Sequence, residues 1–484
     1  MSRDAQPSAW PRVLLAALSL AALIGFFVYP TYPNYDSLYS LIWGQEALHG
    51  HLPSFTVYRA PTEHPLAIVF GAVMSLFGTG GDRLLVGATL ASFVGLVAGV
   101  YRLGAATFTP LVGVVAGILV CTRFDFAFLA ARGYIDIPYL AFVVWAAALE
   151  AQRRRRGRPV FVLLTLAALM RPEAWLLVGL YWLWYAWPRT TTTSTRVKTA
   201  ALAATGPVIW ALVDLAVTGD PLYSLHSTST LADELGRANG LSAVPHATWA
   251  FLTAMDKTPV VLVAIAGLAI AVALFPRRAV GMPALLLAIG LATFGLVGVA
   301  GLSIINRYLL VPGLMILIFA GVALGGWTML SDGLVRRIWA GLFAVALVGG
   351  GVLFAINFNP VRFQNELDFR GRYRGDLIRL LDNPAVKAGL KCGPLSTPNH
   401  KLIPDVRWVT GLGADRVIAR SDPSKRRRIH RGVALFVTQR YALLRQAFVS
   451  PLDDPRTELP LPGFTRVAGD GYYGAYVRCP GATS

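Results

Sequence analysis

Charged residues are scarce in this chain. Asp, Glu, Lys and Arg together make up 14% of its 484 residues, whereas about 25% is usual for soluble globular proteins. Hydrophobic residues reach 55%, and the mean hydropathy is +0.55. Apolar runs of about 20 residues, the length needed to cross a bilayer, recur along the sequence. This pattern excludes a soluble globular protein and predicts a polytopic membrane protein.

Acidic residues are scarcer than basic ones, with 26 Asp and Glu against 44 Lys and Arg and a net charge of +18. Lys and Arg in short loops are retained on the cytoplasmic side of a membrane. The short basic loops are 153–158, 189–198, 277–278 and 336–337. Placing all four inside predicts a plasma-membrane protein with a cytoplasmic N-terminus, 11 or 12 transmembrane helices and an extracytoplasmic region after Phe358.

The first apolar run, Val13–Tyr29, has no small-residue cleavage site before the Tyr-Pro-rich loop, so we interpret it as a retained span rather than a signal peptide. The segment Leu66–Phe77 is short enough to be re-entrant or tilted. The other expected spans are 83–101, 108–122, 136–152, 159–171, 174–187, 199–217, 258–275, 281–301, 307–329 and 338–357.

Composition changes at the end of the last span. We predict a membrane domain over residues 1–357 and a small extracytoplasmic α/β domain over 358–484. Residues 372–390 have a helical pattern, whereas 433–437 and 472–477 have the pattern of strands. The excess of basic residues favours anionic neighbours such as lipid headgroups or acidic glycans, and nucleic acid is not expected on that side of the membrane.

Cysteine is nearly absent, with three residues in the chain. Cys121 lies in a predicted span, whereas Cys392 and Cys479 lie in the predicted outer domain, where disulfides persist. We predict a bond between Cys392 and Cys479. Two free buried thiols are the alternative, because two cysteines do not by themselves fix a pairing.

The predicted first outer loop, residues 31–64, carries the acid to which we give most weight, Asp36. An isolated acid just after a span is commonly a solvated loop residue. The apolar and aromatic residues around Asp36 instead favour a structured lid that packs on the membrane domain. An ordered carboxylate in such a lid is a candidate general base.

Other ionisable residues lie at predicted outer ends of spans, where each needs a partner or a function. Asp136 opens a helix, and the helix dipole alone explains an acid there. Arg171 and Arg307 suit phosphate, because guanidinium groups bind its oxygens in pairs, although interfacial Arg also snorkels to headgroups. We hypothesise that these three residues share one cavity with Asp36, and that Tyr308 belongs to the phosphate site.

A metal site is a further hypothesis, because His49, His51 and His64 lie near Glu46 and Glu63 in the first loop. Such a site needs a third or fourth ligand placed by the fold, and ordinary hydrogen bonding is the alternative. The two outer carboxylates of the hypothetical cavity could instead hold a hard divalent ion. The sequence predicts no certain cofactor and leaves a divalent metal open.

Taken together, these segments resemble the GT-C glycosyltransferases that use polyprenyl-phosphate sugars, in particular the protein O-mannosyltransferase and aminoarabinose transferase group (glycosyltransferase family 39). The matching segments, which extend to about residue 330, are Tyr35-Asp36 with Gly44, Ala47 and Gly50, Glu63-His64-Pro65-Leu66, Ile135-Asp136-Ile137-Pro138, Arg171-Pro172-Glu173 and Asn306-Arg307-Tyr308-Leu309.

The resemblance implies an all-α membrane domain with an outward cavity, a lipid-linked sugar donor that enters from the bilayer, and Asp36 as the catalytic base. Related enzymes often have an acidic pair in this loop, whereas here Ser37 follows Asp36. The role of a second acid is therefore left to Glu46, Glu63 or Asp136.

The implied reaction transfers a hexose or pentose, such as mannose, arabinose or aminoarabinose, to a hydroxyl of a glycan, lipid or protein on the outer face, with inversion. Arg307 and Arg171 are the implied binders of the donor phosphate. Glu46, Glu63 and His64 are candidate loop or acceptor residues. The alternative is a multi-span transporter or lipid flippase, in which midplane charges would line a pathway; the acids here cluster mainly at the outer rims.

Overall fold

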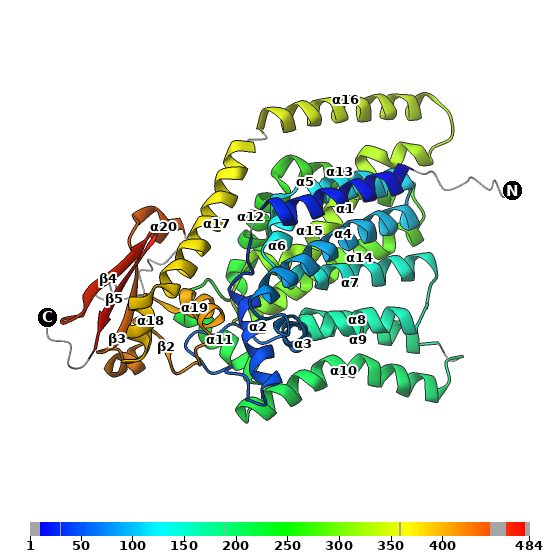
Figure 1. Ribbon diagram of the computed structural model, residues 1–484. Helices are drawn as coiled ribbons and strands as arrows, with labels where there is room; N and C mark the ends of the chain where they lie inside the picture. Colours follow the sequence, from blue (N-terminus) through cyan, green and yellow to red (C-terminus); the bar gives the residue numbers. More distant parts are fainter. Residues whose placement is uncertain (1–9, 30, 189, 358–359, 446–460, 480–484) are drawn as a thin grey trace.

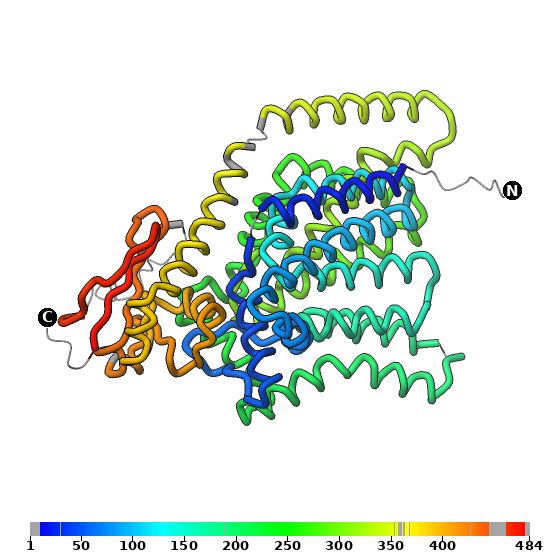
Figure 2. Tube along the Cα trace, in the orientation of Figure 1, coloured from blue at the N-terminus to red at the C-terminus, as the bar shows by residue number. Residues whose placement is uncertain are grey.

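The computed structural model describes residues 10–29, 31–188, 190–357, 360–445 and 461–479. Helices run side by side through most of the molecule, and a small sheet lies beyond one end of the bundle (Figure 1; Figure 2). The bundle helices are α1 (Trp10–Val28), α4 (Gly81–Thr107), α5 (Pro110–Thr122), α7 (Asp136–Gln152), α8 (Arg158–Met170), α9 (Glu173–Ala186), α10 (Thr193–Thr218), α13 (Thr258–Leu274), α14 (Arg277–Val299), α15 (Leu310–Gly325) and α16 (Leu334–Asn357).

The bundle helices differ in how many of their residues are buried, and α15 is the central helix. In α15 every residue from Leu310 to Val322 is buried, and a helix that is apolar on all sides belongs inside a bundle. By contrast, α1 buries no residue, and α16 runs along the outside of the bundle (Figure 1). Exposed apolar helices of this length are stable only against lipid, so the protein is a multi-pass membrane protein.

Six of the described helices are long and apolar enough to cross a membrane, or eight if two bent pairs each count as one span. Those pairs are α5 with α6 (Phe124–Ala131), bent by 64°, and α12 (Val244–Asp256) with α13, bent by 104°. The spans expected at 136–152, 159–171 and 174–187 are helices of 17, 13 and 14 residues. The count of 11 or 12 depends on such shorter helices and stays a prediction.

Shorter elements gather at the end of the bundle that faces the sheet (Figure 1). They are α2 (Tyr35–Leu48), α3 (Pro65–Ser75), α11 (Tyr223–Glu234) and a 3₁₀ turn at Asn306–Leu309. Further 3₁₀ turns are Gly78–Gly80, Leu241–Ala243 and Gly326–Met329. The segment expected to be re-entrant or tilted is α3, at 11 residues much shorter than a span.

The C-terminal region contains a five-stranded mixed sheet in the order β2-β1-β3-β5-β4. Parallel pairs join β1 to β2 and to β3, and antiparallel pairs join β5 to β3 and to β4. Its elements are α17 (Pro360–Asp382), α18 (Pro384–Leu390), β1 (Leu395–Thr397), a 3₁₀ turn (His400–Leu402), α19 (Ile403–Thr410), β2 (Val417–Ala419), a 3₁₀ turn (Pro423–Arg428), β3 (Gly432–Val437), α20 (Arg440–Arg445), β4 (Thr465–Asp470) and β5 (Tyr473–Arg478).

This arrangement confirms the predicted fold class, a helical membrane domain with a small C-terminal α/β part. The strands expected at 433–437 and 472–477 are β3 and β5, and the helix expected over 372–390 is divided by Pro384 into α17 and α18. Cys392 and Cys479 are bonded, with their Cα atoms 5.2 Å apart. The bond fixes the end of β5 beside the chain that enters β1.

The predicted lid over residues 31–64 is partly wrong in its secondary structure, because α2 occupies its first half. The Asn34 side chain caps this helix by accepting hydrogen bonds from the amides of Asp36 and Ser37. Side chains of α2, among them Tyr39 and Trp43, pack in one hydrophobic cluster with residues of α17 and the sheet. The C-terminal region and α2 therefore share a core.

Candidate active site

The start of α2 is fixed to the turn that precedes α7. Asn34 donates through its amide nitrogen to the carbonyl of Arg132, over 3.2 Å, and the Ser37 hydroxyl donates to the carbonyl of Gly133, over 2.6 Å. Gly133 has φ +66°, a conformation that favours glycine. Because α7 begins three residues later at Asp136, these bonds bring two acids that are 100 residues apart in the sequence to one place.

A close crossing of α2 and α3 supports the same geometry. A Cβ atom on Gly44 would overlap the backbone of α3 at Gly71 and Ala72, and one on Gly71 would overlap the backbone of α2 at Ser40. Only glycine allows two helix backbones to approach this closely. The crossing holds α2, and hence Asp36 in its first turn, against the membrane domain.

Two arginines and three acids form a chain of ion pairs where these elements meet. Arg307 Nη1 lies 2.9 Å from Asp36 Oδ2 and 3.5 Å from Asp136 Oδ2. Arg171 pairs with the other Asp136 oxygen and, over 2.7 Å, with Glu173. Asp136 therefore holds both guanidinium groups, and Arg307 is the link between Asp136 and Asp36.

The side chains of these ion pairs differ in their exposure to solvent. The Asp36 and Arg307 side chains are 21% and 27% exposed, whereas that of Asp136 is 0% exposed. Asp136 is not among the residues that line the adjacent cavity. The catalytic role predicted for Asp136 stays a prediction; its buried carboxylate lies between the two arginines that it contacts, which favours a positioning role.

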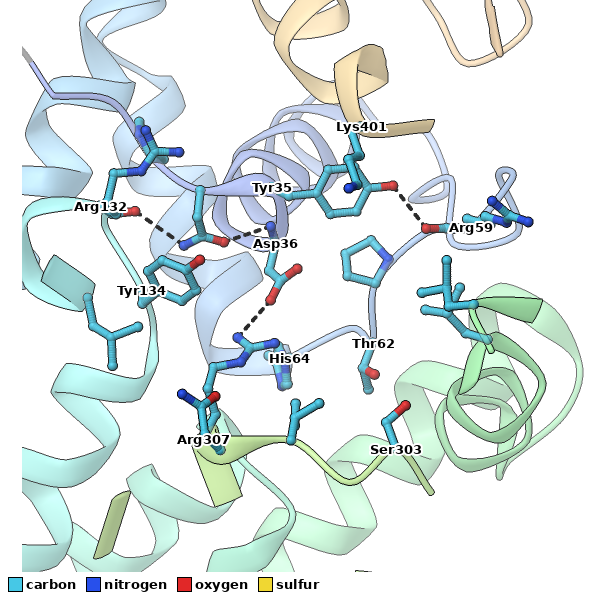
Figure 3. Close-up of a pocket in the computed structure, with 18 of the residues that line it drawn as sticks. Tyr35, Asp36, Arg59, Thr62, His64, Arg132, Tyr134, Ser303, Arg307 and Lys401 are labelled. Atoms are coloured by element: carbon cyan, nitrogen blue, oxygen red, sulfur yellow. Dashed lines mark hydrogen bonds and ion pairs between the residues drawn. The ribbon is translucent and has the colours of Figure 1, made fainter. Parts of the chain in front are cut away.

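A cavity of about 600 Å³ opens onto Asp36 and Arg307. Figure 3 shows Arg307 reaching Asp36 from below, with Arg132 on one side of this pair and Arg59 and Lys401 on the other. Seven basic residues line the cavity against three acidic ones. The basic residues are Arg59, Arg132, Arg171, Arg237, Arg307, Arg370 and Lys401, and the acidic ones are Asp36, Asp125 and Asp405. Walls with this charge favour an anionic ligand.

His64 and Tyr308 both line the cavity, as the sequence led us to expect. The Tyr308 ring lies 5.4 Å from the Arg171 guanidinium carbon, and the His64 ring packs edge-on against Trp210. Burial, together with the nearby Arg171, lowers the pKa of His64 to about 3. His64 is therefore neutral at physiological pH and can act as a hydrogen-bonding group but not as a cation.

Glu63 does not line the cavity, and its expected loop or acceptor role stays a prediction. It is buried beside Asp214 of α10. Asp214 in turn accepts hydrogen bonds from the amide and hydroxyl of Ser224 over 2.9 and 2.6 Å. Burial raises the pKa of Glu63 to about 8, which favours a proton shared between the two carboxyl groups. Glu63 anchors the chain before α3.

Glu46 is also absent from the residues that line the cavity, and its expected loop or acceptor role stays a prediction. Its carboxylate accepts from Arg407 over 2.6 Å and from the Ser54 amide over 2.8 Å. The ion pair occupies the carboxylate and connects α2 to α19, which gives Glu46 a structural role.

The described residues provide no set of ligands for the hypothetical metal site. His49 and His51 are exposed at the far end of α2. Among the described residues, no group of three or more His, Cys, Asp or Glu side chains is placed to hold a metal ion. Asp36 and Asp136, the other candidate pair, are bridged by Arg307.

The C-terminal contribution to the cavity was not predicted from the sequence. Arg370, Tyr373, His400, Lys401 and Asp405 all come from the region after the last span and line the cavity. Arg132 was also missed, although it precedes Asp136 by four residues. It lies over the Tyr32 ring at 4.1 Å. The clustering of Arg and Lys near predicted span ends was the available signal, but the helical pattern alone does not place the C-terminal region over the site.

Comparisons with known proteins agree with this architecture. No protein-family model and no curated protein matches the chain. The structure of ArnT from Cupriavidus metallidurans bound to undecaprenyl phosphate matches over 99% of this chain and 100% of that chain, with a TM-score of 0.57 and 14% identity. The apo form of the same protein matches over 97% and 98%, with a TM-score of 0.52 and 14% identity.

The oligosaccharyltransferase of Archaeoglobus fulgidus, tethered to an acceptor peptide, has a TM-score of 0.54 and 11% identity, over 98% of this chain and 75% of that chain. Both proteins are GT-C superfamily glycosyltransferases. At such low identity the likeness concerns the fold. The chain has the GT-C glycosyltransferase fold, in agreement with the resemblance found in its sequence.

Proposed function

We propose that this protein is a membrane glycosyltransferase that moves a sugar from a polyprenyl-phosphate donor to an acceptor hydroxyl on the outer face of the membrane, with inversion. The observation that carries the proposal is the ion pair of Asp36 with Arg307 at the edge of a basic cavity in a GT-C fold. A neighbour of the same fold binds undecaprenyl phosphate, which supports a lipid-linked donor.

Asp36 is the proposed base. An acceptor hydroxyl is a weak nucleophile, and a carboxylate within about 3 Å of its proton would remove that proton as the bond to the sugar forms. Asp36 lies in the first turn of a capped helix that is fixed at both ends, so its position is well defined. Preorganisation of this kind is a main source of catalytic rate.

Arg307 is the proposed stabiliser of the leaving group. Negative charge develops on the phosphate as the glycosidic bond breaks, and a fixed guanidinium stabilises that charge more in the transition state than in the ground state. Binding of the phosphate would draw Arg307 donors away from Asp36, which frees the carboxylate for the acceptor. Arg171 serves mainly to position Asp136 and thereby Arg307, because its own donors already contact Asp136 and Glu173.

The proposed reaction is a single displacement. The acceptor oxygen attacks the anomeric carbon on the face opposite the phosphate, the glycosidic bond breaks, Asp36 takes the hydroxyl proton, and the polyprenyl phosphate leaves. The sugar and the acceptor stay open, with mannose, arabinose and aminoarabinose as candidate sugars and a glycan, lipid or protein as acceptor.

The test is sugar transfer by the purified protein in lipid nanodiscs, from radiolabelled polyprenyl-phosphate sugars to an envelope extract. We expect Asp36→Asn to lower the rate by about 10²-fold or more while the protein keeps its size-exclusion profile and melting temperature. The matched control is Asp220→Asn, because Asp220 is a partly exposed acid that pairs with His226 outside the cavity. Wild-type turnover in Asp36→Asn, or movement of the donor across the bilayer without sugar transfer, would sink the proposal.

A further inference from the structure

A second cavity lies at the other end of the bundle from the candidate active site. It has a volume of about 740 Å³ and is enclosed by α7, α8, α9 and α14. Asp136 begins α7, whereas Glu150 near the end of α7 lines this cavity. Fourteen helical residues separate the two acids by about 21 Å. In Figure 1 this is the end of α7, α8 and α9 that points away from the sheet.

The walls and the mouth of this cavity differ in chemistry. The walls are formed by aliphatic side chains such as Val143, Leu177 and Leu286. Arg277 and Arg278 line it at the first turn of α14, and both are exposed. In the part of the chain that the structure describes, neither of them has an acidic partner.

The third arginine of this cavity, Arg154, is placed by a buried acid. Glu150 accepts from the amides of Arg155 and Arg156 over 2.6 and 3.1 Å. These bonds hold a tight turn in which Arg155 has φ +54°, an uncommon conformation outside glycine. The Arg154 guanidinium then lies 4.8 Å from the Trp184 ring at the rim.

Glu150 offsets only part of the positive charge of the rim, since three arginines line the cavity with it. Besides the two amides, its carboxylate accepts from the Tyr181 hydroxyl over 2.9 Å and from Trp184 Nε1 over 3.2 Å. A carboxylate that accepts hydrogen bonds from four protein donors is held in a fixed position by them. It is the only acid among the residues that line this cavity. The rim therefore offers three guanidinium groups above an apolar slot.

We propose that this cavity binds an anionic glycerophospholipid from the leaflet at this end of the bundle. Basic pockets between transmembrane helices bind anionic headgroups, and the three arginines match a phosphodiester. The aliphatic walls match an acyl chain, and the volume lies in the range of specific small-molecule sites. The bound lipid bridges α9 and α14, the helices that follow Arg171 and precede Arg307, and so stabilises the frame of the candidate active site.

The test is native mass spectrometry of the delipidated protein, titrated with phosphatidylglycerol and with phosphatidylcholine of the same acyl chains. We expect the first phosphatidylglycerol to bind about tenfold more tightly, a difference of about 1.4 kcal/mol. Replacement of all three arginines, Arg154→Gln, Arg277→Gln and Arg278→Gln, should reduce the preference to about twofold or less. The matched control is Arg336→Gln with Arg337→Gln, a basic pair in the first turn of α16, which begins at the same end of the bundle (Figure 1); neither residue lines the cavity.

A second variant tests the apolar slot. Gly281 lines the cavity, and a Cβ placed on it would have no atom within 4 Å, so Gly281→Phe should occupy part of the slot and weaken binding of both lipids. Gly295→Phe is its control, because Gly295 is equally open on the same helix but outside the cavity. Equal losses in a variant and its control would overturn the proposal.

Discussion

Arg407 of α19 donates to the Glu46 carboxylate near the end of α2 over 2.6 Å, and the Arg407 side chain is 2% exposed. The same helix, α2, carries Asp36 in its first turn, ten residues away. The C-terminal region is thus joined by a nearly buried ion pair to the helix that positions the proposed base.

Arg407→Gln should loosen the C-terminal region and lower transfer. Removing one partner of a buried pair leaves the other charge uncompensated and costs about 3–5 kcal/mol, and less here because Glu46 is partly exposed. We expect faster proteolytic cleavage after residue 360 and a lower melting temperature. The surface pair Arg428 with Asp415 provides the control, since Arg428→Gln should change little. Partial recovery in the double variant with Glu46→Gln would show coupling; additive losses would contradict it.

The two arginines of the site should respond differently to substitution. Arg307 is partly exposed to the cavity, so Arg307→Gln should lower kcat/KM for the lipid-linked donor about tenfold or more, because a hydrogen bond to a charged group contributes about 1.5–3 kcal/mol. Arg171→Gln should chiefly lower stability, because it removes one of the two arginines paired with buried Asp136 and the arginine paired with Glu173. Donor titrations and thermal unfolding separate the two effects. An Arg171 variant with normal stability and a lowered kcat/KM would assign the phosphate to Arg171 instead.

The sequence was sufficient to predict that Asp36, Asp136, Arg171 and Arg307 converge, because span topology constrains the ends of helices. Asp36 and Arg307 are 271 residues apart, yet both follow from the rule that places basic loops on one side. The helix α2 was missed because its Tyr, Trp and Gly residues suit a lid as well as a helix, and its stability comes from packing on α17 and the sheet. Local pattern carries no information about such contacts.

The roles of individual acids were harder to predict for a related reason. Glu46 and Glu63 lie in the same segment as Asp36, and all three have the same chemistry in the sequence. Their environments differ because residues distant in the chain contact two of them. Arg407 contacts Glu46, and Asp214 contacts Glu63, but neither contacts Asp36. Burial and partners, which follow from tertiary structure, decide what a carboxylate can do.

Glu63 should make stability depend on pH. Burial raises its pKa from 4.5 to about 8, so between these values the folded protein binds a proton that the unfolded chain has released. Stability from this group is therefore fully present below about pH 4.5 and is lost as the pH rises towards 8. We expect the melting temperature to fall by several degrees, about 5 °C, from pH 6 to pH 8.5.

Glu63→Gln cannot ionise and should remove most of this dependence. The control is Glu234→Gln, since Glu234 is a partly exposed acid paired with Arg59. A Glu63→Gln protein whose melting temperature keeps the wild-type pH profile would show that Glu63 is ionised in the folded state.

Removal of divalent metal should leave transfer intact. Arg307 contacts both Asp36 and Asp136, so a divalent cation between these carboxylates would lie beside a guanidinium group and be repelled by it. In this arrangement the arginine supplies the positive charge that a metal would otherwise supply to the leaving phosphate. We expect the transfer rate in millimolar EDTA to stay within about twofold of the untreated rate, since no metal-assisted step would be lost. A tenfold loss that Mg²⁺ or Mn²⁺ restores would instead place a metal ion at the phosphate and reduce Arg307 to a structural ion pair.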